Sequence, residues 1–428
     1  MPSTAFASSA TAYMSVGDLP GVTHQSPLVR LRHHCGAALR MLRARSCLAA
    51  TVLLFIFAAI IVKMVSGTTA PEVSNECDQW LAPPHAPVRP WTSALCYAHD
   101  SSENANLAHH VLPRADSHNV SFVVVGDWGR DGFCCQNDVA AEMDRAAHAL
   151  SASFVINAGD SFYEEGLLSP TETQVKTSWV DVYTNETRLP YLSKLPWFGV
   201  LGNHDYRGDA LALPALSQIY PQWIMPARWY DRVIAIGPRA SVHLVFIDTS
   251  PFIAAYRLLR GYTDAPNGIQ TQWSLIPAQL AWLNDTLRAS NATVKIVVGH
   301  HPIFSSGFSS LELGTFMRTN LTPLFEQYNV LAYLSGHEHN LQAHVPKDNP
   351  RTSYFISGAG SKIAGFFTKP DDGFQFYFDD TSGFLVVTVS IPDNPQADEP
   401  PLMVATFLDV KGNIVQTMTK TQQPQVAS

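Results

Sequence analysis

The 428-residue chain lacks an excess of basic residues, has few cysteines and contains only one long apolar run. Its formal charge of −8 excludes the basic surface that is typical of a nucleic-acid-binding protein. Six cysteines in this length exclude a small disulfide scaffold, and the glycines and prolines follow no period, which excludes collagen and coiled coil. With 46% hydrophobic and 15% charged residues, the chain can fill a core and does not have the composition of a disordered protein.

The apolar run lies near the N-terminus and follows a basic segment. Residues 1–46 carry five arginines against one acid, and the run at 47–66 contains a single charge, Lys63. About 20 apolar residues span a bilayer, and positive charge stays on the cytoplasmic side. We therefore expect a cytosolic tail (1–46), a transmembrane signal-anchor (47–66) and a single-pass type II membrane protein whose remainder is lumenal or extracellular. The alternative is a cleaved signal peptide and a secreted protein, if translation starts at Met41.

Sequons and cysteines agree with an oxidising compartment for the remainder. The five N-glycosylation sequons all follow the apolar run, at Asn119, Asn185, Asn284, Asn291 and Asn320. The candidates for disulfides on the same side are Cys77, Cys96, Cys134 and Cys135, which allow three pairings. A Cys77–Cys96 bond would close a short loop. A bond between the adjacent Cys134 and Cys135 would be strained, and each of them can instead reach the 77–96 segment.

The remainder divides into a lead-in and one large domain. Residues 67–118 are polar and contain scattered prolines, which is typical of a stalk or a surface segment. After them, short buried-strand patterns alternate with amphipathic helical patterns, which predicts an α/β domain over 119–420 and a short tail at 421–428. The strand patterns are Phe122–Val125, Phe154–Ala158, Trp197–Leu201, His243–Ile247, Val294–Val298, Val330–Leu334, Tyr354–Ile356, Phe384–Ile391, Met403–Val410 and Ile414–Met418. The helical patterns are Val139–Leu150, Leu280–Leu287 and Leu321–Tyr328.

Five of the strand patterns end in a glycine that is followed by a possible metal ligand. Sites in α/β folds assemble outside the carboxyl ends of the strands, so these side chains are expected to converge. The donors are Asp127, Asp160, Tyr163, Asn203, His300, His337 and His339. One Gly-Asp or Gly-His pair would indicate an ordinary turn, but five in register predict a shared site. Seven donors with one bridging carboxylate fit two ions about 3.5–4 Å apart, which is the clamp that phosphoryl transfer uses.

In order and spacing, these motifs resemble the metallophosphoesterase (calcineurin-like) superfamily and, within it, the purple (tartrate-resistant) acid phosphatases of the short, single-domain type. The resemblance runs from Phe122 to Thr419 and includes Gly336–Gln342 and Ile356–Gly360. It implies a β-sandwich of two mixed sheets flanked by helices, with a dinuclear metal site at the carboxyl ends of the strands.

The resemblance also implies how the ligands are shared. A ferric ion would take Asp127, Tyr163 and His339, a divalent ion (Fe2+, Zn2+ or Mn2+) would take Asn203, His300 and His337, and Asp160 would bridge them. Donor chemistry agrees, because phenolate and carboxylates suit a trivalent cation whereas neutral amide and imidazole suit a divalent one. Most relatives in the superfamily place a histidine where this chain has Gly129, and Tyr163 supplies the missing donor. This exchange favours the purple subgroup and predicts a phenolate-to-iron colour.

The implied function is an acid phosphatase that hydrolyses phosphomonoesters by attack of a metal-bound hydroxide. The expected partners are small phosphomonoesters, with phosphoproteins and nucleotides as further candidates, and no nucleic acid. The resemblance makes His204 a group that binds phosphate or protonates the leaving group, while its structural alternative is to orient Asn203 or cap the turn. Similar enzymes carry one or two histidines where this chain has Phe308 and Ser309, which leaves His204, or Glu338, to protonate the leaving group.

Two other functions compete with this interpretation. Another phosphoesterase, such as a nucleotide phosphodiesterase or a protein phosphatase, is disfavoured by Gly129 and Tyr163. A non-catalytic surface glycoprotein with a phosphatase fold is disfavoured because all seven ligands are present. His301 is expected to support the ligands rather than bind a metal, and residues 206–239 and 256–272 are expected to rim the pocket.

Overall fold

The computed structural model describes most of the predicted catalytic domain. All described residues belong to one compact unit, Leu81–Ser428, and their ranges are 118–238, 240–265, 267–307, 314–364, 367–392 and 399–422. The predicted tail, signal-anchor and lead-in, the cysteines Cys77 and Cys96, and Phe308 and Ser309 lie outside these ranges. Within the described part of the chain, no helix combines the length and apolarity needed to cross a membrane.

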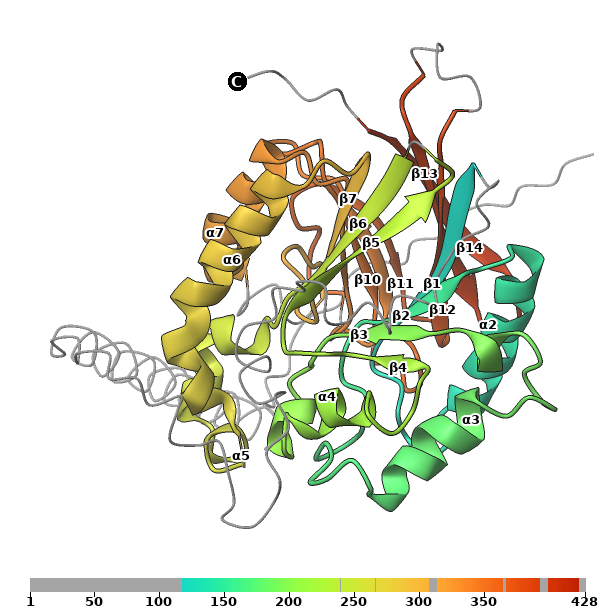
Figure 1. Cartoon of the computed structure of the whole chain (residues 1–428), viewed down its shortest axis with the longest axis vertical. Coiled ribbons are helices and arrows are strands. Elements are labelled where there is room, and N and C mark those ends of the chain that lie inside the picture. Colours follow the sequence, from blue (N-terminus) through green and yellow to red (C-terminus); the bar gives the residue numbers. More distant parts are fainter. Residues whose placement is uncertain are drawn as a thin grey trace, which may run out of the picture. The chain divides into compact units, whose positions relative to one another are not determined.

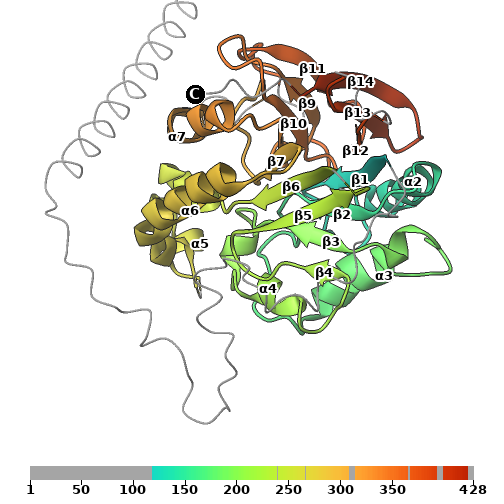
Figure 2. The ribbon, with the colours of Figure 1, turned by 45° about the horizontal axis from the view of Figure 1, so that its top comes forward.

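The described residues form two seven-stranded sheets (Figures 1 and 2). The first sheet has the order β14-β13-β12-β1-β2-β3-β4. Its strands are β1 (Asn119–Val125), β2 (Phe154–Asn157), β3 (Trp197–Gly199), β4 (Trp223–Ile224), β12 (Gly383–Ser390), β13 (Leu402–Asp409) and β14 (Ile414–Thr421). Strands β1 to β4 pair in parallel, whereas β12, β13 and β14 pair antiparallel, so the sheet is mixed.

The second sheet is also mixed and has the order β11-β9-β10-β8-β7-β6-β5. Its strands are β5 (Tyr230–Ile236), β6 (Ala240–Phe246), β7 (Val294–Val298), β8 (Ala332–Ser335), β9 (Leu341–His344), β10 (Ser353–Ser357) and β11 (Phe374–Phe378). Strands β6, β7, β8 and β10 pair in parallel, and β5, β9 and β11 pair antiparallel. β7, β8 and β10 are buried along their whole length, and apolar residues predominate in them, although β7 also contains Lys295.

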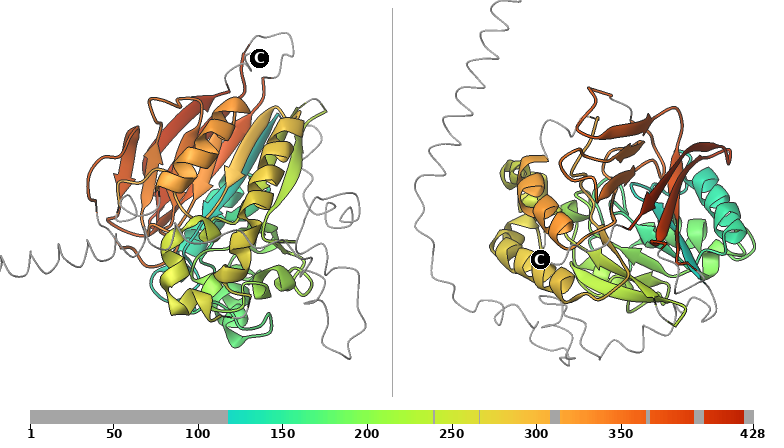
Figure 3. Two further views of the ribbon diagram at one scale, coloured as in Figure 1. Left: turned by 90° about the vertical axis from the view of Figure 1, so that its left-hand side faces the viewer. Right: turned by 90° about the horizontal axis from the view of Figure 1, so that it is seen from above.

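Helices cover both outer faces (Figures 2 and 3). Helices α2 and α3 lie on the first sheet's side, and α5, α6 and α7 on the second sheet's side. The helices are α2 (Gln136–Ala149), α3 (Asp181–Tyr183), α4 (Ala212–Leu216), α5 (Arg260–Thr263), α6 (Ile276–Ala289) and α7 (Gly314–Gln327), together with a π-helix, η3 (Val175–Val180). Short 3-10 segments are η4 (Leu192–Lys194), η5 (Asp205–Arg207), η6 (Ser250–Phe252), η7 (Ala254–Leu258) and η8 (Ile269–Leu275). The amphipathic stripe explains α2, because Val139 and Met143 are buried on one face.

Aromatic side chains fill the space between the sheets. Phe246 of β6 stacks on Phe198 of β3, with 5.9 Å between ring centroids, and Phe355 of β10 lies 6.1 Å from Phe407 of β13. The predicted α/β sandwich flanked by helices is therefore confirmed. Part of the 206–239 segment forms the edge strand β5, whose side chains are a mixture of buried, half-buried and exposed.

Candidate metal centre

The predicted ligands lie on loops that leave the carboxyl ends of parallel strands in both sheets. β1, β2 and β3 belong to the first sheet, and β7 and β8 belong to the second. Backbone hydrogen bonds join the loops across the sheets, because the N–H of Gly126 donates to the carbonyl of Ser357 (2.8 Å). The N–H of His337 also donates to Asp127 Oδ2, at 2.8 Å. The loops of the two sheets are therefore held together at one edge of the sandwich.

The glycines that precede the ligands allow a very close approach of backbone and side chains. A Cβ on Gly202 would lie 2.1 Å from Asp160 Oδ1, and Gly159 has a φ of +92°. Asp127, Asp160 and His337 themselves have φ values of 61°, 50° and 70°, in the left-handed region that non-glycine residues rarely adopt. Such backbone strain is typical of functional sites, where the surrounding structure enforces it.

The first group of donors surrounds the phenol oxygen of Tyr163. This oxygen lies 2.8 Å from Asp127 Oδ1, 3.0 Å from Asp160 Oδ2 and 2.9 Å from His339 Nε2. His339 Nε2 is also 3.5 Å from Asp127 Oδ1. Four side chains thus direct one oxygen or nitrogen atom each at a common point.

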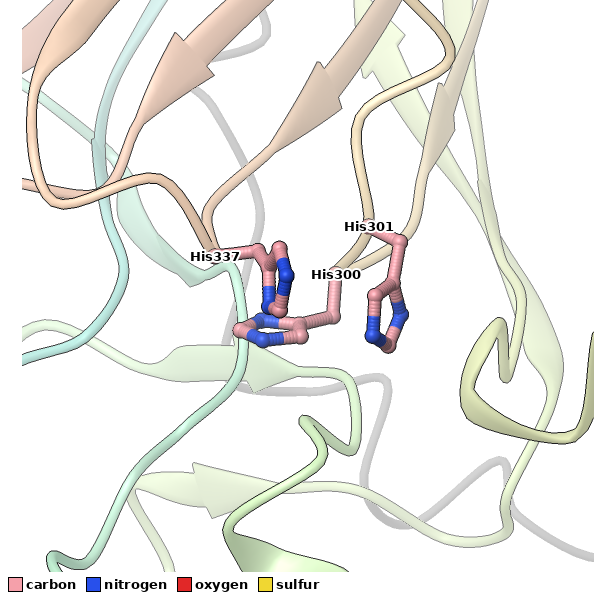
Figure 4. Close-up of side chains that lie close together, drawn as sticks. All are labelled: His300, His301 and His337. Carbon is pink, nitrogen blue, oxygen red and sulfur yellow. The ribbon is translucent and has the colours of Figure 1, made fainter. Parts of the chain in front are cut away.

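The second group surrounds the amide oxygen of Asn203. This oxygen lies 2.8 Å from His337 Nδ1 and 3.2 Å from His300 Nε2. His300 Nε2 is in turn 3.4 Å from Asp160 Oδ2, which is the same oxygen that faces Tyr163. The structure therefore brings all seven sequence-predicted donors together in two groups that share Asp160. Figure 4 shows two of them, His300 and His337, side by side.

The donor atoms fit bound cations. His300 Nδ1 lies 2.8 Å from the carbonyl of Ala158, which can only accept, so Nδ1 carries a hydrogen. The other nitrogen of a neutral His300 then turns its lone pair toward the oxygens of Asn203 and Asp160. Lone pairs that converge on one point repel each other unless a proton or a metal ion lies between them.

The electrostatics of the site depend on that positive charge. Burial and the carboxylates of Asp127 and Asp160 raise the pKa of Tyr163. Burial alone would lower the pKa of His300, but Asp160 outweighs it and raises the pKa to about 9. Burial and the neighbouring His300 lower the pKa of His337 to about 3, so His337 is a neutral imidazole. A bound metal would displace the protons of Tyr163 and His300.

His301 lies beside the ligands, as Figure 4 shows, but its nitrogens are engaged elsewhere. Nδ1 is 2.8 Å from the hydroxyl of Thr249, and Nε2 is 2.9 Å from the hydroxyl of Tyr256. One nitrogen each of His300, His301 and His337 lie within 4.8 Å of one another, a separation that would suit a metal. Because hydroxyl groups already occupy both nitrogens of His301, we assign it a supporting position beside the ligands.

His204 lies at the margin of the site. Its backbone N–H donates to Asp160 Oδ1 (2.7 Å), its Nδ1 lies 2.6 Å from the carbonyl of Glu164, and its side chain is 15% exposed. Its ring centroid is 4.4 Å from that of Tyr163. The alternative proton donor, Glu338, is buried and accepts a hydrogen bond from Ser305 at 3.3 Å.

Three residues that the sequence did not single out complete the surroundings. Buried Asp205 accepts hydrogen bonds from the backbone of Ser161 (3.0 Å) and Gly202 (2.8 Å), and so ties two ligand loops together. The guanidinium carbon of Arg130 lies 3.7 Å from the ring centroid of Tyr163. Tyr262 contacts Asn203 from the 256–272 segment. The position of Asp205 directly after Gly-Asn-His was a usable signal; Arg130 and Tyr262 carry no motif.

The predicted modification sites differ in exposure. Asn119, Asn185 and Asn291 are exposed, whereas Asn284 and Asn320 are half-buried. Cys134 and Cys135 are exposed and are not bonded to each other.

Comparisons of the sequence with known proteins point to phosphoesterases. Residues 120–341 match the family described as calcineurin-like phosphoesterase. The chain is 35% identical to purple acid phosphatase 4 of Arabidopsis thaliana over 318 residues, which cover 73% of this chain and 86% of the relative. It is 29% identical to tartrate-resistant acid phosphatase type 5 of Homo sapiens over 322 residues, 72% of this chain and 91% of the relative.

A solved structure shares the fold. It is described as GAP50, the anchor in the inner membrane complex of Plasmodium, and it superposes with a TM-score of 0.56 at 24% identity. The superposition covers 72% of this chain and 90% of that one.

Proposed function

Because this chain belongs to the purple acid phosphatases of the calcineurin-like phosphoesterase family, and is thus a metal-dependent acid phosphatase, we propose that it works with one ferric and one divalent ion. The observation that carries this proposal is the pair of donor groups that share Asp160 Oδ2. One group is anionic and the other is neutral apart from Asp160, which suits two ions of different charge.

The proposed ligands follow from the two groups. Asp127, Tyr163 and His339 would hold the ferric ion, Asn203, His300 and His337 would hold the divalent ion, and Asp160 would bridge them. When bound, the two ions supply Lewis-acid charge that lowers the pKa of water and neutralises charge on the transferring phosphoryl group.

The chain's own residues position substrate and protons around the ions. Asp205 fixes the loops that carry Asp160 and Asn203, so the donors are preorganised. The carbonyl of Glu164 holds the hydrogen on Nδ1 of His204, which leaves Nε2 to exchange a proton. We assign His204 to phosphate binding or to protonation of the leaving group, because it lies beside both Tyr163 and Asp160.

The test is metal analysis, an absorption spectrum and hydrolysis of p-nitrophenyl phosphate across pH, all on the purified full-length chain. We expect about one iron and one divalent ion per chain, a visible band and turnover on the acid side of neutrality. Two metals without a visible band would overturn the ferric assignment and point to another phosphoesterase. Protein that binds no metal would overturn the proposal as a whole.

We also propose that the catalytic domain is lumenal or extracellular and is joined to the signal-anchor at 47–66. Sequon asparagines Asn119, Asn185 and Asn291 are exposed and therefore accessible to glycosylation. Cys134 and Cys135 are exposed, and Cys77 and Cys96 are the other candidates for disulfides on this side of the membrane. Glycosidase treatment should shift the mass of the cellular protein, and non-reducing peptide mapping should recover the disulfides. An unmodified chain digested by protease from the cytosolic side would contradict this topology.

A further inference from the structure

Tyr262 of α5 places a phenol group next to the neutral half of the metal centre. It is 6% exposed, and its oxygen lies 3.2 Å from Asn203 Nδ2 and 3.3 Å from Arg207 Nη2. The other terminus of the same amide, Asn203 Oδ1, faces His300 and His337. The phenol is therefore separated from the metal-binding atoms by a single amide group.

Neither of the two contacts of the Tyr262 oxygen uses the hydrogen of its own hydroxyl group. The NH2 group of asparagine and the guanidinium of arginine can only donate, so the oxygen of Tyr262 accepts from both Asn203 and Arg207. Its own O–H is directed elsewhere, and a buried O–H costs free energy unless it finds an acceptor. A phosphoryl oxygen bound at the adjacent centre is such an acceptor.

Tyr262 is also held from behind. Its ring stacks on Tyr256 with 4.5 Å between centroids, and the hydroxyl of Tyr256 lies 2.9 Å from His301 Nε2. His301 in turn is anchored by Thr249 at 2.8 Å. The path from His301 through Tyr256 to Tyr262 explains why a histidine with two occupied nitrogens stands directly after the ligand His300. These contacts fix α5, which carries the phenol.

Arg207 completes the support from the solvent side. Its Nη1 lies 3.4 Å from the carbonyl of Glu164 and 3.8 Å from Glu165 Oε1, and its side chain is 27% exposed. These contacts hold the guanidinium against the phenol oxygen. A positively charged donor makes the phenol a stronger hydrogen-bond donor to an anion, because it withdraws electron density from the phenol oxygen.

From this geometry we infer that Tyr262 is a substrate-binding residue, which donates its phenol hydrogen to a non-bridging oxygen of the phosphoryl group, with Arg207 as the residue that positions it. This inference rests on the proposed function, since it requires phosphate to bind at the metal centre. It adds a contact from α5, a segment that has no recognisable motif.

The test is direct binding of inorganic phosphate to the metal-loaded, full-length protein, by calorimetry and by the shift of the visible band. Tyr262→Phe keeps the ring stack but removes the hydrogen. A hydrogen bond to a charged group is lost, so the dissociation constant for phosphate should rise about tenfold to a hundredfold. Metal content should stay that of the wild type. Tyr328→Phe removes a hydroxyl that binds Asn284 on α6 at 2.8 Å, and it should bind phosphate as the wild type does.

The outcomes separate this inference from the proposed function. If the wild type hydrolyses phosphomonoesters and Tyr262→Phe binds phosphate as tightly as the wild type, the inference is wrong and the proposed function stands. If Tyr262→Phe loses the divalent ion, the phenol holds Asn203 rather than substrate, and the inference is again overturned. A wild-type protein that neither binds phosphate nor turns over substrate would overturn both.

Discussion

The two sheets bring different chemistry to the metal centre. The loops after β1, β2 and β3 of the first sheet supply oxygen atoms, from Asp127, Asp160, Tyr163 and Asn203. The loops after β7 and β8 of the second sheet supply nitrogen atoms, from His300, His337 and His339. Each donor group draws on both sheets, so neither sheet alone carries a complete set of ligands. Bound ions would therefore bridge the two halves of the sandwich.

The difference in chemistry also sets the charges on the two sides. Burial would raise the pKa of Asp160, but His300 and His204 outweigh it and hold the pKa well below its usual range. The same contact raises the pKa of His300 to about 9. Without ions, the sheets are thus joined by an ion pair between Asp160 and His300. When ions are bound, Asp160 and His300 would serve as their ligands instead. Metal binding and the packing of the two sheets therefore depend on the same side chains. Four changes to the protein or to its conditions test what each sheet contributes.

Removal of Asp160 should have the largest effect, because one oxygen of its carboxylate, Oδ2, lies 3.0 Å from the phenol oxygen of Tyr163 and 3.4 Å from Nε2 of His300, and so faces donor atoms of both groups. In Asp160→Ala both ions should be lost or bound weakly. Several kcal/mol of transition-state stabilisation would go with them, so turnover should fall about a thousandfold or more. Metal analysis and p-nitrophenyl phosphate hydrolysis measure this. Asp285→Ala, which removes an exposed carboxylate paired with Arg288, is the matched control and should leave both unchanged. Wild-type turnover in Asp160→Ala would refute the shared site.

Removal of the metals should loosen the whole sandwich. A ligand present at a thousandfold its dissociation constant stabilises the native state by about 4 kcal/mol. For a domain of this size, each kcal/mol corresponds to about 2–4 °C in melting temperature. A strong chelator should thus lower the melting temperature by about 8–16 °C for each ion that it removes, whereas chelator already saturated with metal should not. If the metal-free protein melted at the same temperature, the ions would not join the sheets.

Much of the centre was predictable because its signals are local. A buried strand, a glycine and a ligand follow each other within a few residues, so all seven donors could be named from the sequence. Partners across the fold could not be named. β11 was missed because its residues are half-exposed and show no buried run. Arg228 lies in the segment that was expected to rim the pocket, but it is buried and donates a hydrogen bond to Tyr206. No local sequence pattern predicts that contact. Tyr262 was missed for the same reason, since its partner Asn203 is 59 residues away.

The second sheet should respond to acid through His344 of β9. Burial lowers the pKa of this histidine to about 4. Its pKa in the unfolded chain is about 6.5. The neutral histidine therefore contributes fully to the free energy of unfolding above pH 6.5, and this contribution, about 3 kcal/mol, is lost as the pH falls toward 4. Denaturant unfolding of the metal-free protein at pH 7 and pH 4 measures this. Between pH 7 and pH 4, the free energy of unfolding of His344→Gln should fall by about 3 kcal/mol less than that of the wild type. An equal loss in both proteins would show that His344 does not titrate in this range; His148→Gln on α2 is the control.

The smallest effect is expected at Arg130, on the first sheet's side of the centre. Its guanidinium lies over the ring of Tyr163 at 3.7 Å and pairs with Glu164. The attraction between a cation and an aromatic ring is worth about 0.5–2 kcal/mol. When Tyr163 is a phenolate bound to iron, the guanidinium would also stabilise the phenolate electrons whose transfer to iron gives the colour. In Arg130→Gln the visible band should move to longer wavelength, because the phenolate then gives up an electron more easily. Turnover should change only a few-fold, about what 1 kcal/mol predicts.

Arg145→Gln, on the exposed side of α2, should leave the band in place. An unmoved band in Arg130→Gln would mean that the guanidinium leaves the ring once iron binds, and that the charge of Tyr163 is balanced by the metal alone.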